Sequence, residues 1–260
     1  MGAPGKEYEH DNVMLGRAAW AGSQRYGSGV WSGDTKSTWE DFNQQFRAGL
    51  NMVMSGITYW TTDIGGFAGG NTEDPDFREL VVRWFQWGAF CPLFRLHGAR
   101  SGPTWPPGDA GVCGQTASNE VWMFGDESEA AIVRVMRIRE QLRPYVMEQY
   151  SAAARFGTPV MRPLFFDFHD DPGSQGIDDE QMFGPDYLVA PVLHKGAASR
   201  KVYLPPLPKG TVWANVFTGV ETDTSDGGKT VTEATPLDTF PLYKRHAKVA
   251  YPSRAAASVA

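Results

Sequence analysis

Short apolar runs alternate with helical patterns in the first part of this chain. Each run ends in glycine and polar residues, as a buried strand does where it enters a loop. Four such runs are the predicted strands: 12–20, 28–34, 56–67 and 87–98. Amphipathic helical spacing separates them after Ser37 and after Asp74. Strand, loop, helix and strand again is typical of parallel βα units.

The helix boundaries carry recognisable signals. Ser37 followed by Glu40 has the spacing of a capping box, which predicts the start of the first helix. Asp74 followed by proline predicts the start of the second helix. A third helical pattern spans about 127–156, with a break or kink at Pro144.

The pattern changes near residue 157. Short β-type runs then follow one another, separated by Pro, Gly and Asp turns, which predicts an antiparallel sandwich. These runs are 158–168, 180–193, 200–206, 211–217, 229–234 and 238–245. We therefore divide the chain into an α/β domain over residues 1–156 and a β-sandwich with a frayed tail over 157–260.

Composition narrows the class of protein. The 260 residues are 42% hydrophobic, enough to bury a sizeable core, and the net charge of −6 argues against a nucleic-acid partner. No apolar run approaches the roughly 18 residues of a membrane span, so we expect no membrane association. Cys91 and Cys113 match no metal-ligand spacing and leave the cellular compartment undefined.

Four polar residues stand just after the predicted strands: Arg17, Asp34, Asp63 and His97. If these strands are parallel neighbours, all four side chains point into one mouth. Two carboxylates with an arginine and a histidine, in a chain with nine Trp, suit glycoside chemistry. A phosphate site, a metal site or structural salt bridges are the alternatives. A metal site is the weaker of these, because no compact ligand motif is present.

Each residue also has a simpler interpretation. Asp34 after a glycine is more often a turn former or a helix cap. Arg17 can simply pair with a buried carboxylate, and a lone His97 is usually a hydrogen-bonded core residue. The glycines after Asp63 can serve only the turn.

Several ordered blocks resemble glycoside hydrolase family 31, the retaining α-glucosidases and α-xylosidases. Three of them look like successive active-site blocks of that family: GRAAWAGSQRYGSGVWSGD, YWTTDIGGF and RWFQWGAFCPLFRLHG. Two more resemble the end of its barrel and the sandwich that follows: RPYVMEQYSAAARFGTPVMRPLFFDF and QMFGPDYLVAPVL. The resemblance covers roughly residues 12–245.

The resemblance implies a role for each motif residue. Asp34 matches the general acid/base of the family, and Arg17 matches an arginine that contacts the sugar and orders nearby carboxylates. Asp63 and His97 match polar residues that hold sugar hydroxyls in the −1 subsite. The aromatic wall beside them is expected to comprise Trp31, Trp60 and Phe67.

One element of the family pattern has no match. The nucleophile of the family is an aspartate on an earlier strand, and nothing before Arg17 resembles that block. Only about four of eight barrel strands are predicted. The expected fold class is therefore α/β: the C-terminal half of a (β/α)₈ barrel followed by an antiparallel β-sandwich. The N-terminal half of the barrel is an expected partner.

The expected function is that of a retaining α-glycosidase acting on α-xylosides, with carbohydrate as its substrate partner. An α-glucosidase of the same family is the close alternative. A catalytically inactive sugar-binding or scaffold fragment is the alternative from another class, because the nucleophile is absent. A nucleotide-binding protein is disfavoured, since no glycine-rich phosphate loop is found. No cofactor or metal is expected, because retaining hydrolysis uses carboxylates and water.

Overall fold

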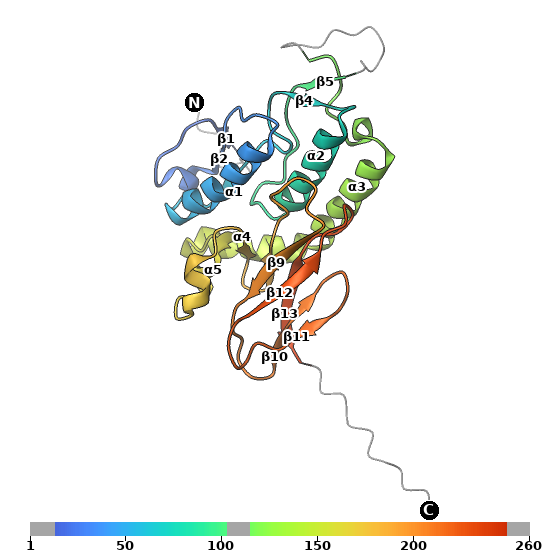
Figure 1. Ribbon diagram of the computed structural model, residues 1–260. Helices are drawn as coiled ribbons and strands as arrows, with labels where there is room; N and C mark the ends of the chain where they lie inside the picture. Colours follow the sequence, from blue (N-terminus) through green and yellow to red (C-terminus); the bar gives the residue numbers. More distant parts are fainter. Residues whose placement is uncertain (1–13, 103–114, 249–260) are drawn as a thin grey trace, which may run out of the picture.

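The computed structural model describes residues 14–102 and 115–248. They form a helix-rich α/β part and a strand-rich part, seen in the upper and lower halves of Figure 1. The α/β part contains β1 (Met14–Gly16), η2 (Ser23–Tyr26), β2 (Ser28–Trp31), α1 (Trp39–Met54), β3 (Trp60–Thr61), β4 (Gly70–Asn71), α2 (Pro75–Gly88), β5 (Arg100–Ser101), η4 (Val121–Phe124), α3 (Asp126–Gln141) and α4 (Arg143–Phe156).

Strands β1, β2 and β3 form a parallel sheet in that order. This confirms the first three predicted strands. The fourth prediction, a strand over 87–98, is wrong. Helix α2 continues to Gly88, because Trp84 and Trp87 lie one helical turn apart and are both fully buried. The segment after it joins the sheet only through a single parallel bridge between Ile64 and Leu96.

Helix α1 begins one residue later than predicted. The hydroxyl of Thr38, not Ser37, accepts a hydrogen bond from the Asp41 N–H at 3.1 Å. The Asp41 carboxylate in turn accepts a hydrogen bond from the Lys36 N–H. The hydroxyl half of the predicted box is therefore present one position later, but its second half differs. The Thr38 N–H donates to the Lys36 carbonyl oxygen, so the Asp41 carboxylate binds the Lys36 N–H instead. The apolar face of α1 is buried as its spacing predicts.

The third helical pattern divides into α3 and α4 at Leu142, just before Pro144. Proline is tolerated in the first turn of a helix, where its missing N–H is not needed, so α4 begins there. Gly157 ends α4 in a left-handed conformation with φ of 73°.

The strand-rich part has two antiparallel layers. A six-stranded sheet has the order β11-β10-β13-β8-β7-β6, and β9 pairs with β12 in a second sheet. Leu188, Val202 and Trp213 from the two sheets share one buried cluster, as in a sandwich. The elements are β6 (Met161–Pro163), α5 (Leu164–Asp167), η5 (Pro172–Gly176), β7 (Gln181–Phe183), β8 (Tyr187–Val189), β9 (Ser199–Leu204), β10 (Thr211–Asn215), β11 (Glu221–Thr222), β12 (Lys229–Ala234) and β13 (Leu242–Ala247).

One predicted β-run is only partly a strand. Of residues 158–168, β6 accounts for three, and the following LFFD segment forms the short helix α5. The Arg162 guanidinium binds both oxygens of Asp167, at 2.7 and 2.9 Å. This bidentate pair ties the helical turn back to the strand.

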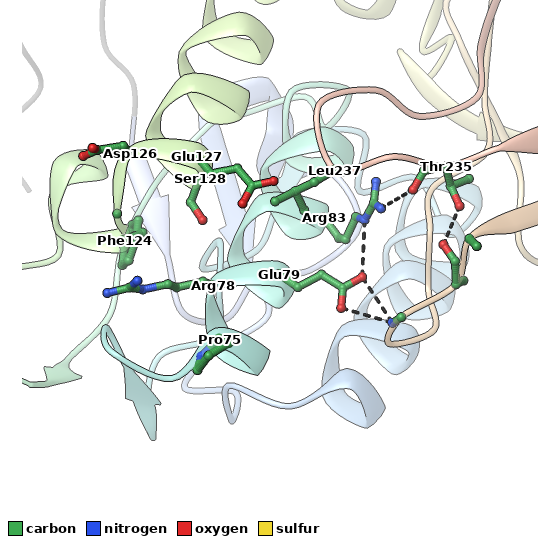
Figure 2. A pocket seen from close by; sticks show the side chains of 14 residues that line it. Pro75, Arg78, Glu79, Arg83, Phe124, Asp126, Glu127, Ser128, Thr235 and Leu237 are labelled. Atoms are coloured by element: carbon green, nitrogen blue, oxygen red, sulfur yellow. Dashed lines mark hydrogen bonds and ion pairs between the residues drawn. The ribbon is translucent and has the colours of Figure 1, made fainter.

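The two parts are joined by hydrogen bonds from α2 to sandwich loops (Figure 2). The buried guanidinium of Arg83 donates to the backbone oxygens of Thr235, Pro236 and Thr239. Glu79 accepts from the N–H of Gly196 at 3.1–3.2 Å. A hollow of about 800 Å³ lies beside this joint, between α2, α3 and the loops.

Three sequence expectations concern membrane spans, the cysteines and the C-terminal tail. None of the helices described is long and apolar enough to cross a membrane. Cys91 is a buried free thiol, whereas Cys113 lies outside the described residues. The predicted frayed tail at 253–260 also lies outside them.

Glu180 is a buried carboxyl in the sandwich and sets a pH dependence of stability. One oxygen accepts a hydrogen bond from the Tyr203 N–H at 2.7 Å, while the other, Oε2, has no hydrogen-bond partner among the described residues. Burial raises the pKa of Glu180 to about 8. Because the folded state then binds more protons than the unfolded state, stability falls as the pH rises from about 4.5 to 8.

We therefore expect the Glu180→Gln variant to lose less stability than the wild type between pH 5 and pH 8. The difference should be about 3 kcal/mol, because each unit of pKa shift corresponds to about 1.4 kcal/mol. Urea unfolding of both proteins at the two pH values measures it. An equal pH dependence of the two proteins would contradict this account of Glu180.

Candidate active site

Arg17 and Asp34 meet at the ends of neighbouring strands. Arg17 directly follows β1, and Asp34 lies in the turn after β2, with Gly16 paired to Val30 in the parallel register. The Arg17 Nη2 and Asp34 Oδ2 atoms are 3.3 Å apart. The Asp34 side chain is 44% exposed, so its carboxylate is accessible from the solvent.

Asp63 lies deeper, after β3, and has no exposed surface. Its Oδ1 is ion-paired with Nη1 of Arg95, whereas the buried Oδ2 finds no hydrogen-bond partner within 14–102 and 115–248. Burial raises the pKa of Asp63, while the hydrogen bond and charge of Arg95 and the charge of His97 oppose the rise. Asp63 is thus fully enclosed in this structure, and its expected contact with a sugar hydroxyl stays a prediction. Arg95, with its side chain a quarter exposed, is the accessible member of the pair.

The aromatic and histidine residues lie around this pair. The rings of Phe67 and His97 are 5.7 Å apart between centroids. The Arg95 guanidinium carbon is 5.8 Å from the centroid of the Trp31 ring. His97 is exposed, whereas Phe67 and Trp31 are partly buried. His97 and Asp34 both act electrostatically on Asp63, so these groups share one neighbourhood.

Trp60 is the exception among the predicted residues. It is 1% exposed and packs against Trp87 of α2, with ring centroids 5.9 Å apart. In the strand register Trp60 pairs with Val30, whereas Trp31 pairs with Thr61. Successive residues of a strand point to opposite faces, so the two tryptophans do too. Trp60 therefore belongs to the core beneath the helices, and its placement in the aromatic wall is wrong.

Glycines allow the loops beyond the strands to pack closely. The loop of Gly66 runs beside Lys36, where a Cβ at Gly66 would lie 2.5 Å from the Lys36 carbonyl oxygen. Gly98 approaches Gly66 in the same way, with 2.5 Å between its would-be Cβ and the Gly66 oxygen. Both glycines also have positive φ, 76° and 145°. Gly65 and Gly66, the glycines after Asp63, thus have the positive φ that the turn interpretation requires, 83° and 76°.

Two arginines that the sequence analysis did not single out organise the site. The buried Arg100 donates to the carbonyl oxygens of Ile64 and Gly66. Burial lowers its pKa to about 10, so it stays charged at neutral pH. Arg95 forms the pair with Asp63 described above. Its position two residues before His97 in the FRLHG block was the available signal.

The candidate site combines carboxylates, arginines and aromatic rings at the strand ends. An exposed carboxylate beside an arginine stands next to a buried carboxylate–arginine pair and partly buried aromatic rings. Within 14–102 and 115–248, no cluster of three or more His, Cys, Asp or Glu is placed to hold a metal ion. The hollow at the domain joint contains none of the candidate residues. The arrangement is that expected of a barrel-type glycoside hydrolase.

Comparison with known proteins identifies the same family that the sequence motifs resemble. The glycosyl hydrolases family 31 TIM-barrel domain matches residues 1–149, and the family 31 C-terminal domain matches residues 157–249. The chain therefore belongs to glycoside hydrolase family 31. Its fold is part of the family's TIM-barrel domain followed by the C-terminal β-sandwich, as the sequence predicted.

Individual relatives are glycoside hydrolases. The chain is 38% identical to an α-xylosidase of Saccharolobus solfataricus, over 91% of this chain and 29% of that protein. It is 35% identical to α-glucosidase 2 of Bacillus thermoamyloliquefaciens, over 88% of this chain and 26% of that protein. The structure of a family 31 α-xylosidase from a soil metagenome, solved with xylose, superposes with a TM-score of 0.80. Its sequence is 48% identical, and the match covers 90% of this chain and 34% of that protein. The chain thus spans about a third of the length of these relatives.

Gly66 gives a direct test of the loop packing. We expect Gly66→Ala to destabilise the protein by about 2 kcal/mol or more, because alanine meets both a positive φ and the Lys36 carbonyl. Gly69→Ala is the matched control, since Gly69 has a φ of 93° but nothing within 4 Å of its would-be Cβ. Thermal or urea unfolding of the two variants compares them. Equal destabilisation would mean that the close contact contributes nothing.

Proposed function

We propose that this chain is the C-terminal part of the catalytic barrel, with its adjoining sandwich, of a retaining α-glycosidase. The observation that carries the proposal is the Arg17–Asp34 ion pair at the ends of two parallel strands, beside the buried Asp63–Arg95 pair. Membership of family 31 supports the retaining class. The boundary between the two domains is proposed near residue 157.

Asp34 is the proposed general acid/base. An exposed carboxylate at a strand end can protonate a leaving oxygen and then remove a proton from the attacking water. Arg17, 3.3 Å away, holds the carboxylate in one orientation and offers its remaining N–H groups to the sugar. His97, Trp31 and Phe67 form the proposed wall of the sugar subsite, with Asp63 directly behind it.

The proposed substrates are α-linked xylosides. Two observations favour them over α-glucosides: the 38% identical relative is an α-xylosidase, and the 48% identical structure is an α-xylosidase with xylose bound. The 35% identical α-glucosidase makes glucosides the second candidate. In a complete enzyme containing this chain, we expect a higher kcat/KM for an aryl α-xyloside than for the matching α-glucoside. A strong preference for the glucoside would contradict the assignment.

The proposed nucleophile is an aspartate on an earlier barrel strand, in the N-terminal half of the barrel that this sequence does not contain. The relatives are about three times as long as this chain, which leaves room for those strands. The N-terminal half of the barrel is thus the proposed partner. The alternative, an inactive sugar-binding or scaffold fragment, is favoured only by the absence of a matching nucleophile block in this sequence.

The role of Asp34 can be tested in a chimera with a complete barrel. In it, residues 14–248 replace the corresponding segment of the soil-metagenome α-xylosidase. We expect the chimera to release aryl alcohol from an aryl α-xyloside, and Asp34→Asn to lower kcat/KM at least about 100-fold, as loss of a general acid does. The matched control is Asp178→Asn, because Asp178 is also an exposed aspartate paired with an arginine.

The 260-residue chain, assayed alone, should give no Asp34-dependent release. Release that Asp34→Asn abolishes would mean that a carboxylate within this chain replaces the nucleophile. A folded chimera that is inactive on both xyloside and glucoside would contradict the proposed function.

A further inference from the structure

We propose that Arg95, rather than Asp63, is the member of the buried pair that contacts the substrate, and that Asp63 is the positioning residue that holds it. This inference rests on the proposed glycosidase function and assigns a binding group within the same site. It concerns a residue to which the motif comparison gave no role.

Asp63 and Arg95 differ in how much of each side chain is exposed to solvent. Asp63 has no exposed surface, and its free oxygen is buried as well. Reaching a ligand would therefore require Asp63 to move. The Arg95 side chain is 25% exposed in the same structure. The pair thus presents a guanidinium to the site, not a carboxylate.

Arg95 has donors to spare. A guanidinium carries five N–H donors, and among the described residues only the donation from Nη1 to Asp63 is found. Its flat group lies near the Trp31 ring, 5.8 Å from guanidinium carbon to centroid. The anchor on one side and the ring on the other hold the guanidinium in a defined position. The remaining donors fit an acceptor such as a sugar hydroxyl oxygen.

The charges around Asp63 are consistent with an anchoring role. Arg95 and His97 come from the segment after α2, Arg100 from β5, and Asp34 from the turn after β2. The first three favour the ionised form of Asp63, whereas Asp34 opposes it. A buried carboxylate without Arg95 would be unfavourable, so the anchor and the donor stabilise each other.

The test asks whether Arg95 binds one particular hydroxyl group of the ligand. Methyl α-D-xylopyranoside and its 2-, 3- and 4-deoxy analogues are titrated into the full 260-residue chain, with binding followed by ligand-observed NMR. The same ligands are used as competitive inhibitors of the chimera. We expect one deoxy analogue to bind the wild type about tenfold more weakly than the parent, because a hydrogen bond to a charged donor is lost.

In the Arg95→Met variant that difference should disappear, and the parent xyloside should bind about tenfold more weakly. Arg95→Lys keeps the charge but not the planar fork, and should recover part of the affinity. Asp63→Asn should retain a smaller hydroxyl preference, since its amide oxygen still accepts from Arg95. Arg47→Met is the matched control, because Arg47 forms an ion pair on the surface of α1 and should leave all affinities unchanged.

The outcomes separate this inference from the function on which it rests. If Arg95→Met retains the wild-type preference for the hydroxyl, or weakens all four ligands equally, Arg95 makes no ligand contact and the inference is wrong. In either case the glycosidase function stands. If wild-type chain and chimera bind none of the four ligands, the proposed function fails and this inference fails with it.

Discussion

The burial of Asp63 is the constraint on which the site depends. A carboxylate with no exposed surface is stable only beside a compensating charge, and Arg95 supplies it. This pairing draws the segment after α2 against the end of β3, where a single bridge from Ile64 to Leu96 continues the sheet. The buried Arg100 then fixes the loop between them by donating to its carbonyl oxygens.

The sandwich contributes to the same arrangement through α2. In the sequence this helix lies between the loop of Asp63 and the segment of Arg95. Arg83 and Gln86 fasten α2 to backbone oxygens of the loop at 235–239. Both donor side chains are buried, so losing either hydrogen-bonding group would leave backbone oxygens without a partner at a cost in stability. The second domain therefore supports the helix that lies between the two candidate-site segments in the sequence.

Local signals in the sequence predicted most helices and strands, but they placed the start of helix α1 and the end of helix α2 less accurately. The capping pattern before α1 was visible, but two adjacent hydroxyl-bearing residues, Ser37 and Thr38, made its register ambiguous. Thr38 rather than Ser37 provides the cap. Residues 87–98 are apolar enough for a strand or a buried helix end. The length of the run does not distinguish a strand from the end of a buried helix. The structure does, because Trp87 is buried as part of helix α2.

The sequence by itself determined the family, the two-domain architecture and the polar residues at the strand ends, because these are local motifs in a fixed order. Only the tertiary structure decided which aromatic residue faces the site. Trp31 and Trp60 look alike in sequence, since barrel strands are apolar on both faces. Strand register places them on opposite faces. The pairing of Arg95 with Asp63 likewise joins residues 32 positions apart, which no local pattern specifies.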